Sequence, residues 1–415
     1  MEERRPRAPA RCPRDPRAPG AARQGARRLS TLAHSLSDGT LLARLVGIDS
    51  TSDLSNLPLA DFICDYVDRP GVRITRNQSS DGQKTNLLLA AGPERGDRRG
   101  LILSGHMDVV PATEPEWRTD PFLLTEVHQT YAGRGTADMK GFLALAINRF
   151  RALDPALLRD PLLLLLTYDE ETGTLGARHF TETWASPATL PRRVVIGEPT
   201  SLRVVRLHKG MLRLRLEFEG RAAHSGYPHL GRSAIEPAAR AIVALSDLRR
   251  AMEAERPANG EFFPQVPFAA LNVGTVAGGS AANVIPDRCV VQLGIRLLPE
   301  MSSDEMAERV RATVRSGVGG DPFTLDHVSL SPAMMLPAEA GIHRELCDAV
   351  GQHESHSVMF ATDAGWLQRI GLDCVLFGPG TIEVAHRPNE SLPIAEFVRA
   401  GRILDDLILR TCLAS

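Results

Sequence analysis

The sequence predicts an α/β protein: a mostly parallel sheet flanked by helices on both faces, with a small α+β, ferredoxin-like domain inserted into it. In residues 31–203 and 331–415, short apolar segments of strand length alternate with amphipathic segments of helix length. Between these two parts the pattern changes to strict polar–apolar alternation, which is typical of antiparallel strands with one wet face. With 415 residues and 43% hydrophobic content, the chain is long enough for two domains.

The first 30 residues differ from the rest in composition. They hold nine arginines, five prolines, three acidic residues and no aromatic residue. Such a segment cannot bury enough apolar surface to fold, so residues 1–30 are expected to form a disordered tail. They lack an apolar core of the kind that secretory signals carry, so no secretory signal is expected.

The main domain is expected to consist of residues 31–203 and 331–415. Its helices are predicted from 3.6-residue periodicity and its strands from short apolar runs. The predicted helices are Ser35–Asn56, Met139–Arg151, 341–350 and Ala395–Leu409, and the predicted strands are Thr85–Ala90, Leu101–Ser104, Leu162–Thr167, Val194–Ile196 and Val375–Phe377.

The inserted domain is expected to span residues 204–330. Its predicted elements follow the order β-α-β-β-α-β. They are a strand at Met211–Phe218, a helix at Ser233–Glu253, strands at Ala269–Val276 and Cys289–Leu298, and a helix at Ser303–Arg315, before a closing strand.

Charge and hydropathy exclude several classes of partner. The formal net charge is −2, which favours neither nucleic acid nor an anionic membrane surface. No apolar run approaches the roughly 20 residues that span a bilayer.

Six cysteines stand singly without a CxxC pair, so free, mostly buried thiols in a reducing cytoplasm are expected.

Acidic and histidine residues follow several predicted strands directly. In open α/β sheets the carboxyl ends of the strands meet at one edge, so these side chains are expected to converge. A cluster of carboxylates is costly unless cations neutralise it. Taken singly, each such residue is more often a helix cap or a solvated group, and it is the collection that indicates a site. The collection comprises His106, Asp108, Asp138, Glu170, Glu171, Glu198 and His386.

The types of residue indicate the kind of metal. Histidine with carboxylate, and no cysteine, suits zinc, cobalt or manganese in an open catalytic site. Two histidines with a shared carboxylate could hold two ions about 3.5–4 Å apart. One acid of the Glu170–Glu171 pair would then be free to act as a general base.

A set of motifs resembles the di-zinc aminoacylase and peptidase superfamily, which includes acetylornithine deacetylase, succinyl-diaminopimelate desuccinylase and glutamate carboxypeptidase. The resemblance runs in order from about residue 36 to the C-terminus. Three segments look most like acetylornithine deacetylase: GEPTSLRVVRLHKG, RLLPEM and GPGTIEVAHRPNE. The other motifs are SGHMDVVP, GRGTADMKGF, YDEETGTLGA, GRAAHSG and NVIPDR.

The resemblance implies a role for each residue of the cluster. Two divalent ions are implied, with Zn²⁺ the first choice and Co²⁺ an alternative. His106 and Glu198 would bind one ion, Glu171 and His386 the other, and Asp138 would bridge them. Glu170 would be the general base. Asp108 would be the acid that fixes the tautomer and orientation of His106. In some relatives the peptide bond after the bridging Asp is cis.

Further residues are implied by the same resemblance. In relatives, the histidine at His224 reaches the neighbouring subunit's active site and stabilises the oxyanion, which implies a homodimer joined through the inserted domain. Asn283 and Arg296 match residues that hold the substrate. Gly378 and Gly380 would let the backbone approach it closely. From the residues alone, a polar hairpin residue is the favoured interpretation of His224, and a strand-face ion pair is nearly as plausible for Arg296.

The implied activity is metal-dependent removal of the acyl group from an N-acyl amino acid, with N-acetylornithine of arginine biosynthesis as the first expectation. A succinyl-diaminopimelate desuccinylase, a broad aminoacylase or dipeptidase, and an inactive small-molecule-binding relative are the alternatives. Asp363 stands where acetylornithine deacetylases often carry Glu, and Asn389 replaces a commoner Asp. An acid at position 363 could meet the distal amine of the substrate. The shorter Asp could therefore change which amino-acid side chain the enzyme prefers.

Overall fold

The computed structural model describes residues 35–413. The arginine- and proline-rich segment that the sequence predicts to be disordered lies outside the described residues. Two sheets organise the described chain, and each has its own layer of helices and its own apolar core.

The large sheet has nine strands in the order β1-β2-β6-β3-β7-β17-β8-β15, with β16 also paired to β8. Its four central strands, β6, β3, β7 and β17, are parallel, and the strands outside them pair mainly antiparallel. Every residue of β6 is buried, as expected for a central strand covered on both faces. The strands are β1 Val72–Gln78, β2 Thr85–Ala91, β3 Leu101–His106, β6 Leu162–Thr167, β7 Arg193–Ile196, β8 Val205–His208, β15 Met334–Met335, β16 His356–Val358 and β17 Asp373–Leu376.

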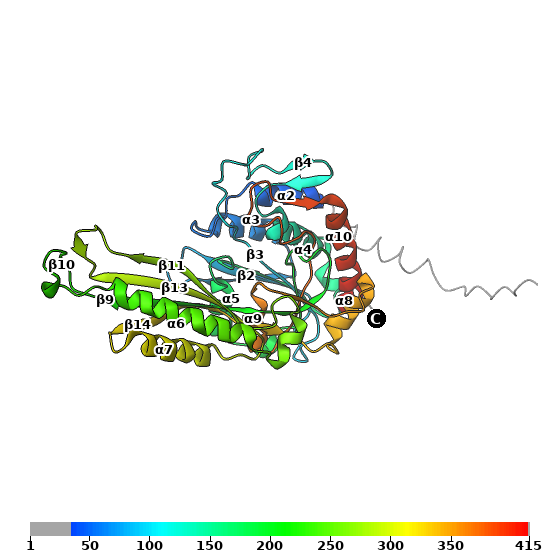
Figure 1. Ribbon diagram of the computed structural model, residues 1–415. Helices are drawn as coiled ribbons and strands as arrows, with labels where there is room; N and C mark the ends of the chain where they lie inside the picture. Colours follow the sequence, from blue (N-terminus) through cyan, green and yellow to red (C-terminus); the bar gives the residue numbers. More distant parts are fainter. Residues whose placement is uncertain (1–34, 414–415) are drawn as a thin grey trace, which may run out of the picture.

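Helices cover both faces of this sheet (Figure 1). The larger apolar core lies on the face covered by α2 Asp38–Val46, α3 Leu57–Val67, α4 Gly141–Ala152, α8 Gly341–Val350 and α10 Ile394–Ile408. A second core lies on the other face, under α5 Leu175–Thr183 and α9 Ala364–Arg369. The predicted fold class is therefore confirmed.

The helix predicted over Ser35–Asn56 is shorter than expected. It ends at Val46, and Gly47 is its C-cap residue. A loop rich in Asp and Ser follows, whose side chains compete for backbone hydrogen bonds and favour turns. The next helix, α3, begins only at Leu57.

The small sheet has the order β11-β13-β9-β14 and is entirely antiparallel. Two helices, α6 and α7, cover one of its faces and complete the predicted β-α-β-β-α-β order. This unit extends away from the large sheet, with the short antiparallel pair of strands β10 and β12 at its far end (Figure 1). The elements are β9 Gly210–Glu219, β10 Ala223–His224, α6 Ile235–Ala254, β11 Ala270–Gly278, β12 Val284–Ile285, β13 Arg288–Leu297, α7 Ser303–Val318 and β14 Phe323–Ser331.

The inserted unit begins later than residue 204, where the sequence analysis placed it. Strand β8 belongs to the large sheet, since it pairs with β15, β16 and β17. All four of its residues are buried, and the polar–apolar alternation of the small sheet starts only in β9. The small sheet therefore starts at Gly210.

Two further features complete the fold. Strands β4 Thr125–Val127, β5 Thr130–Ala132 and β18 Ser391–Pro393 form a three-stranded sheet. Among residues 35–413, no helix has the length and apolar character needed to cross a lipid bilayer.

Gly197, directly after β7, is expected to be essential for packing. A Cβ at this position would lie 1.9 Å from Cγ of Phe142, whose side chain is buried. Gly197→Ala should therefore lower the free energy of unfolding by roughly 1–3 kcal/mol, measured by urea denaturation. Gly96→Ala is the matched control, because no atom lies within 4 Å of its added Cβ. Equal stability of the two variants would contradict this packing argument.

Candidate active site

The candidate site lies at the carboxyl ends of the central parallel strands. His106 is the last residue of β3, Glu170 and Glu171 follow β6, and Glu198 follows β7. Strands β6, β3 and β7 are neighbours and run in the same direction, so these side chains meet at one sheet edge.

Two sets of side chains could each hold a metal ion. His106, Asp138 and Glu198 form one set, and Asp138, Glu171 and His386 form the other; within each set the ligand atoms lie within 4.8 Å of one another. Asp138 Oδ1 lies 3.0 Å from His106 Nε2, and Asp138 Oδ2 lies 3.4 Å from His386 Nε2. The structure thus brings together all five residues predicted as ligands, with Asp138 shared between the two sets.

Asp138 is held by a buried carboxylate that the sequence analysis did not single out. Glu390 accepts the backbone N–H groups of Gly135 (3.0 Å), Ala137 (2.9 Å) and Asp138 (3.0 Å). It also pairs with the buried guanidinium of Arg134 at 2.9 Å. The Asp138–Met139 peptide bond is cis. The only hint of this contact in the sequence is the arginine beside the glycine-rich turn. Its partner, Glu390, lies more than 250 residues further along the chain.

His106 contacts both the side chain and the main chain of Asp108, and the main-chain contact, which was not expected, is the shorter of the two. His106 Nδ1 is 2.9 Å from the main-chain carbonyl oxygen of Asp108 and 3.6 Å from its nearer carboxylate oxygen. The carbonyl therefore accepts the Nδ1 proton and leaves Nε2 facing Asp138. The turn after β3 brings the carbonyl closer to the imidazole than the side chain.

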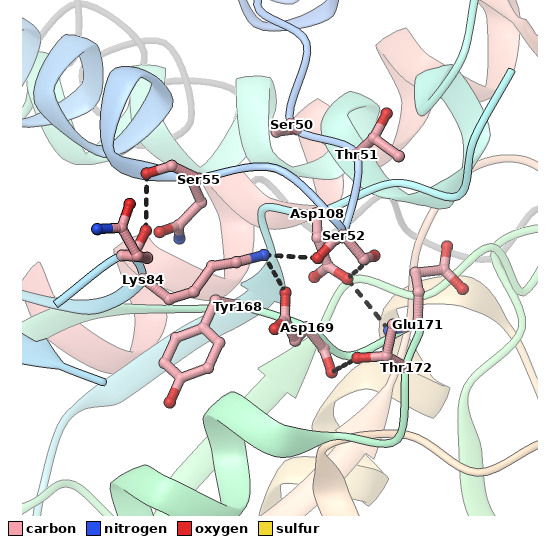
Figure 2. Close-up of polar contacts among 12 residues, drawn as sticks. Ser50, Thr51, Ser52, Ser55, Lys84, Asp108, Tyr168, Asp169, Glu171 and Thr172 are labelled. Atoms are coloured by element: carbon pink, nitrogen blue, oxygen red, sulfur yellow. Dashed lines mark hydrogen bonds and ion pairs between the residues drawn. The ribbon is translucent and has the colours of Figure 1, made fainter. Parts of the chain in front are cut away.

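The carboxylate of Asp108 instead holds the loop that carries the two glutamates (Figure 2). Its oxygens accept the N–H groups of Glu170 at 3.1 Å and Glu171 at 3.2 Å. They also accept the hydroxyl of Ser52 at 2.7 Å, and Figure 2 shows Asp108 with Glu171 and Ser52. Each of these bonds involves a charged acceptor, which strengthens it. Asp108 therefore fixes the position of Glu170 and Glu171.

A lysine extends this network, and no motif indicated it. Lys84 Nζ lies 2.6 Å from Asp169 Oδ1 and 2.6 Å from the carbonyl of Ser52 (Figure 2). The side chains of Lys84 and Asp169 are only 12% and 14% exposed, so water screens this ion pair weakly. Asp169 has a φ of 51°, and its ion pair stabilises the turn directly before Glu170.

The electrostatics of the cluster call for cations. Burial and then the neighbouring charge of Glu198 raise the pKa of Glu170 well above its ordinary value. Burial and then Asp138 raise the pKa of Glu171 to about 7. Burial opposes ionisation of Asp138 as well, but hydrogen bonds from the two histidines more than offset it and lower its pKa. One carboxylate oxygen each of Glu171 and Glu198 is buried without a hydrogen-bond partner among the described residues. These imidazole and carboxylate donors fit two divalent ions.

The cluster opens into a cavity of about 280 Å³ between the two units. The large sheet contributes its acids and His386, and the small sheet contributes Met211, Arg213 and Arg296. A larger cleft, of about 520 Å³, involves Gly100, Arg193 and Asp373 at the opposite, amino ends of β3, β7 and β17. Neither group of potential metal ligands found in residues 35–413 lies in that cleft. The chemistry therefore belongs to the smaller cavity.

The other residues predicted to contact substrate have different locations. Arg296 lines the cavity. His224 and Asn283 are exposed, and they lie where strand β10 pairs with β12, at the far end of the small unit (Figure 1). They are absent from the lining of this chain's own cavity, as far as residues 35–413 show.

Gly378 and Gly380 pack against the chain itself. The Gly378 N–H donates to the hydroxyl of Thr200, and the Gly380 N–H donates to the carboxylate of Glu396. Neither glycine lines the cavity. Their expected approach to the substrate therefore stays a prediction. Gly378 permits close packing against the carbonyl of Glu198, 2.6 Å from where its Cβ would lie.

Asp363 is likewise beneath the site. Its side chain is buried, and its Oδ2 accepts the hydroxyl of Thr167 at 2.5 Å. It does not line the cavity, so its expected contact with a distal amine of the substrate stays a prediction.

Comparisons with solved structures agree with the fold. An M20 family metallo-carboxypeptidase from Sulfolobus solfataricus aligns with a TM-score of 0.73 over 90% of this chain and 99% of its own, at 17% identity. A tripeptidase from Staphylococcus aureus aligns with a TM-score of 0.68 over 90% of this chain and 97% of its own, at 17% identity.

Comparisons of the sequence with known proteins give higher identities than these structures do. Acetylornithine deacetylase of Proteus mirabilis is 35% identical over 370 residues, which are 88% of this chain and 93% of that protein. The Myxococcus xanthus enzyme of the same name is 34% identical over 377 residues, 89% of this chain and 96% of that protein. The model of peptidase family M20/M25/M40 matches residues 102–410. The chain therefore belongs to peptidase family M20/M25/M40 and is a metallo-amidohydrolase.

Proposed function

We propose that the protein removes the acyl group from N-acyl amino acids, and that N-acetylornithine is its substrate in arginine biosynthesis. The observation that carries this proposal is the pair of ligand sets sharing Asp138, with Glu170 beside them in the same cavity. The names of the curated relatives support acetylornithine as the substrate.

Two divalent ions would be held at the shared site, one by His106, Asp138 and Glu198 and the other by Asp138, Glu171 and His386. Zinc is the first choice and cobalt the alternative, since imidazole and carboxylate ligands without thiolate suit both. Such ions polarise an amide carbonyl and make water acidic enough to attack at neutral pH.

Glu170 would then handle the protons. It lines the cavity but belongs to neither ligand set, so its carboxylate is free for chemistry. Its raised pKa lets it take a proton from the attacking water and return one to the leaving nitrogen. Asp108 keeps it in place through the Glu170 N–H.

We further propose a homodimer in which His224 of one protomer serves the partner's cavity. Three observations support this. His224 is exposed, lies at the far end of the small unit, and accepts the N–H of Gly226 on Nδ1 at 3.0 Å. That bond places the proton of the neutral imidazole on Nε2, where it can be donated to a developing oxyanion.

The substrate assignment is tested by assaying the zinc- and cobalt-loaded protein against N-acetylornithine, N-acetylcitrulline, N-succinyl-diaminopimelate and N-acetylmethionine. N-acetylornithine is expected to have the highest kcat/KM. A higher kcat/KM for N-succinyl-diaminopimelate would make that compound the assigned substrate instead. If none of the compounds is hydrolysed, the proposed function is refuted. Glu170→Gln is the control for the chemistry: it should lower kcat roughly 100- to 10,000-fold with metal content unchanged.

Removal of metal should destabilise the protein more at pH 8 than at pH 5.5. Burial raises the pKa of Glu171 to about 7, and contacts with Asp138 and Glu171 raise that of His386 to about 10. The metal-free folded chain thus binds more protons than the unfolded chain, and its stability falls as pH rises, by about 1.4 kcal/mol per pH unit for each extra proton. Bound ions replace these protons.

The measurement is the Tm of zinc-loaded and chelator-treated protein across this pH range. The difference between the two Tm values should widen as pH rises. A difference that is constant or narrows with pH would show that the cluster does not exchange protons for metal.

The homodimer proposal predicts complementation between two inactive variants. Glu170→Gln and His224→Ala should each be inactive alone. After subunit exchange, half of the dimers carry one intact site, so about a quarter of wild-type activity should return. If His224 serves its own subunit, mixing will restore nothing.

A further inference from the structure

We propose that Arg213 is a second substrate-binding residue, and that Arg213 and Arg296 together bind the α-carboxylate of the N-acyl amino acid. The inference rests on the proposed function, because it assigns the part of the substrate that the small unit recognises. It concerns binding and leaves the assignment of the metal ligands and of Glu170 unchanged.

Strand register places the two arginines on one face of the small sheet. Arg296 of β13 is paired with Met211 of β9, and Arg213 stands two residues further along β9. Side chains two residues apart in a strand share a face, so Arg213 is the diagonal neighbour of Arg296. Leu212 and Leu214 point to the opposite face, into the core under the helices. Met211, Arg213 and Arg296 all line the cavity of the metal cluster.

Neither guanidinium group has a carboxylate partner among the residues that the structure describes. In residues 35–413, Arg213 donates a hydrogen bond to the carbonyl of Thr172 at 3.3 Å, and neither arginine forms an ion pair. The next arginine on the same face, Arg215, is by contrast paired with Glu217 and Asp326. Burial, and then the nearby charge of Arg213, lower the pKa of Arg296, and the charge of Glu170 opposes them only in part. Two like charges in one partly buried place are unfavourable, and an anionic ligand between them would remove the conflict.

The cavity orients such a ligand. Its acids, Asp138, Glu170, Glu171 and Glu198, all lie on the large-sheet side with the metal sets. Its two cations other than histidine lie on the small-sheet side. An N-acyl amino acid has its scissile amide next to its carboxylate, so the carboxylate would face the arginines when the amide faces Glu170. A planar guanidinium matches a carboxylate with two parallel hydrogen bonds.

Arg213 also contacts the catalytic loop. The carbonyl that it binds belongs to Thr172, which directly follows Glu171. The residue therefore spans the boundary between the two units, from the small sheet to the loop that Asp108 holds. A carboxylate bound at Arg213 would be positioned relative to Glu170 through this single contact.

The test compares two substrates that differ at the carboxylate: N-acetylornithine and its α-carboxamide. Arg213→Met should lower kcat/KM for N-acetylornithine roughly 10- to 100-fold, the loss expected for a hydrogen bond to a charged group. It should change kcat/KM for the carboxamide much less, since the neutral amide lacks the charge that Arg213 recognises. Arg213→Lys should restore part of the loss, because it keeps the charge without the planar fork.

Arg215→Met is the matched control and should leave both substrates unaffected. Equal losses of Arg213→Met on the acid and the carboxamide would overturn the proposal and assign Arg213 to the loop alone. No loss on either substrate would also overturn it. These outcomes are separate from failure of the proposed function, which would appear as a wild-type protein that hydrolyses neither compound.

Discussion

The main constraint on this structure is the mutual repulsion of four carboxylates that lie together at one edge of the large sheet. Asp138, Glu170, Glu171 and Glu198 face one another in a largely buried place, so solvent screens their charges only weakly. The histidines lower the pKa of all four carboxylates, but only at Asp138 do they outweigh burial. Divalent cations held by these ligand sets would remove it for the whole cluster and would supply the chemistry. Metal binding, stability and catalysis would then follow from one electrostatic arrangement.

A second ring of contacts keeps that arrangement in place. Glu390 binds the backbone of the turn that presents Asp138, and Asp108 binds the backbone of the loop that presents Glu170 and Glu171. Lys84 fixes the same loop from the other side through Asp169. In each of these contacts a charged group binds a backbone N–H or an opposite charge, and hydrogen bonds of this kind are strong. They therefore oppose movement of the mutually repelling acids away from one another.

The small sheet supplies what the large sheet lacks. All acids of the cavity come from the large unit, and Arg213 and Arg296 come from the small one. The wet face of an antiparallel sheet, which the alternation in β9 created, is the surface that carries these arginines. The insertion thus adds cationic groups to an anionic site without disturbing the buried parallel strands that form it.

The sequence by itself determined the fold class, the order of the strands and helices, and the five potential metal ligands, because these depend on local periodicity and on motifs of a few residues. The helix that ends at Val46 and the later start of the small sheet show its limits, since capping and strand pairing decide boundaries. Only the tertiary structure decided that the Asp108 carboxylate holds the glutamate loop while its carbonyl orients His106. It also decided that Asp363 is buried below the cavity. Contacts of this kind join segments far apart in the chain, and a difference of under 1 Å between two oxygens settles them, which no pattern in the sequence records.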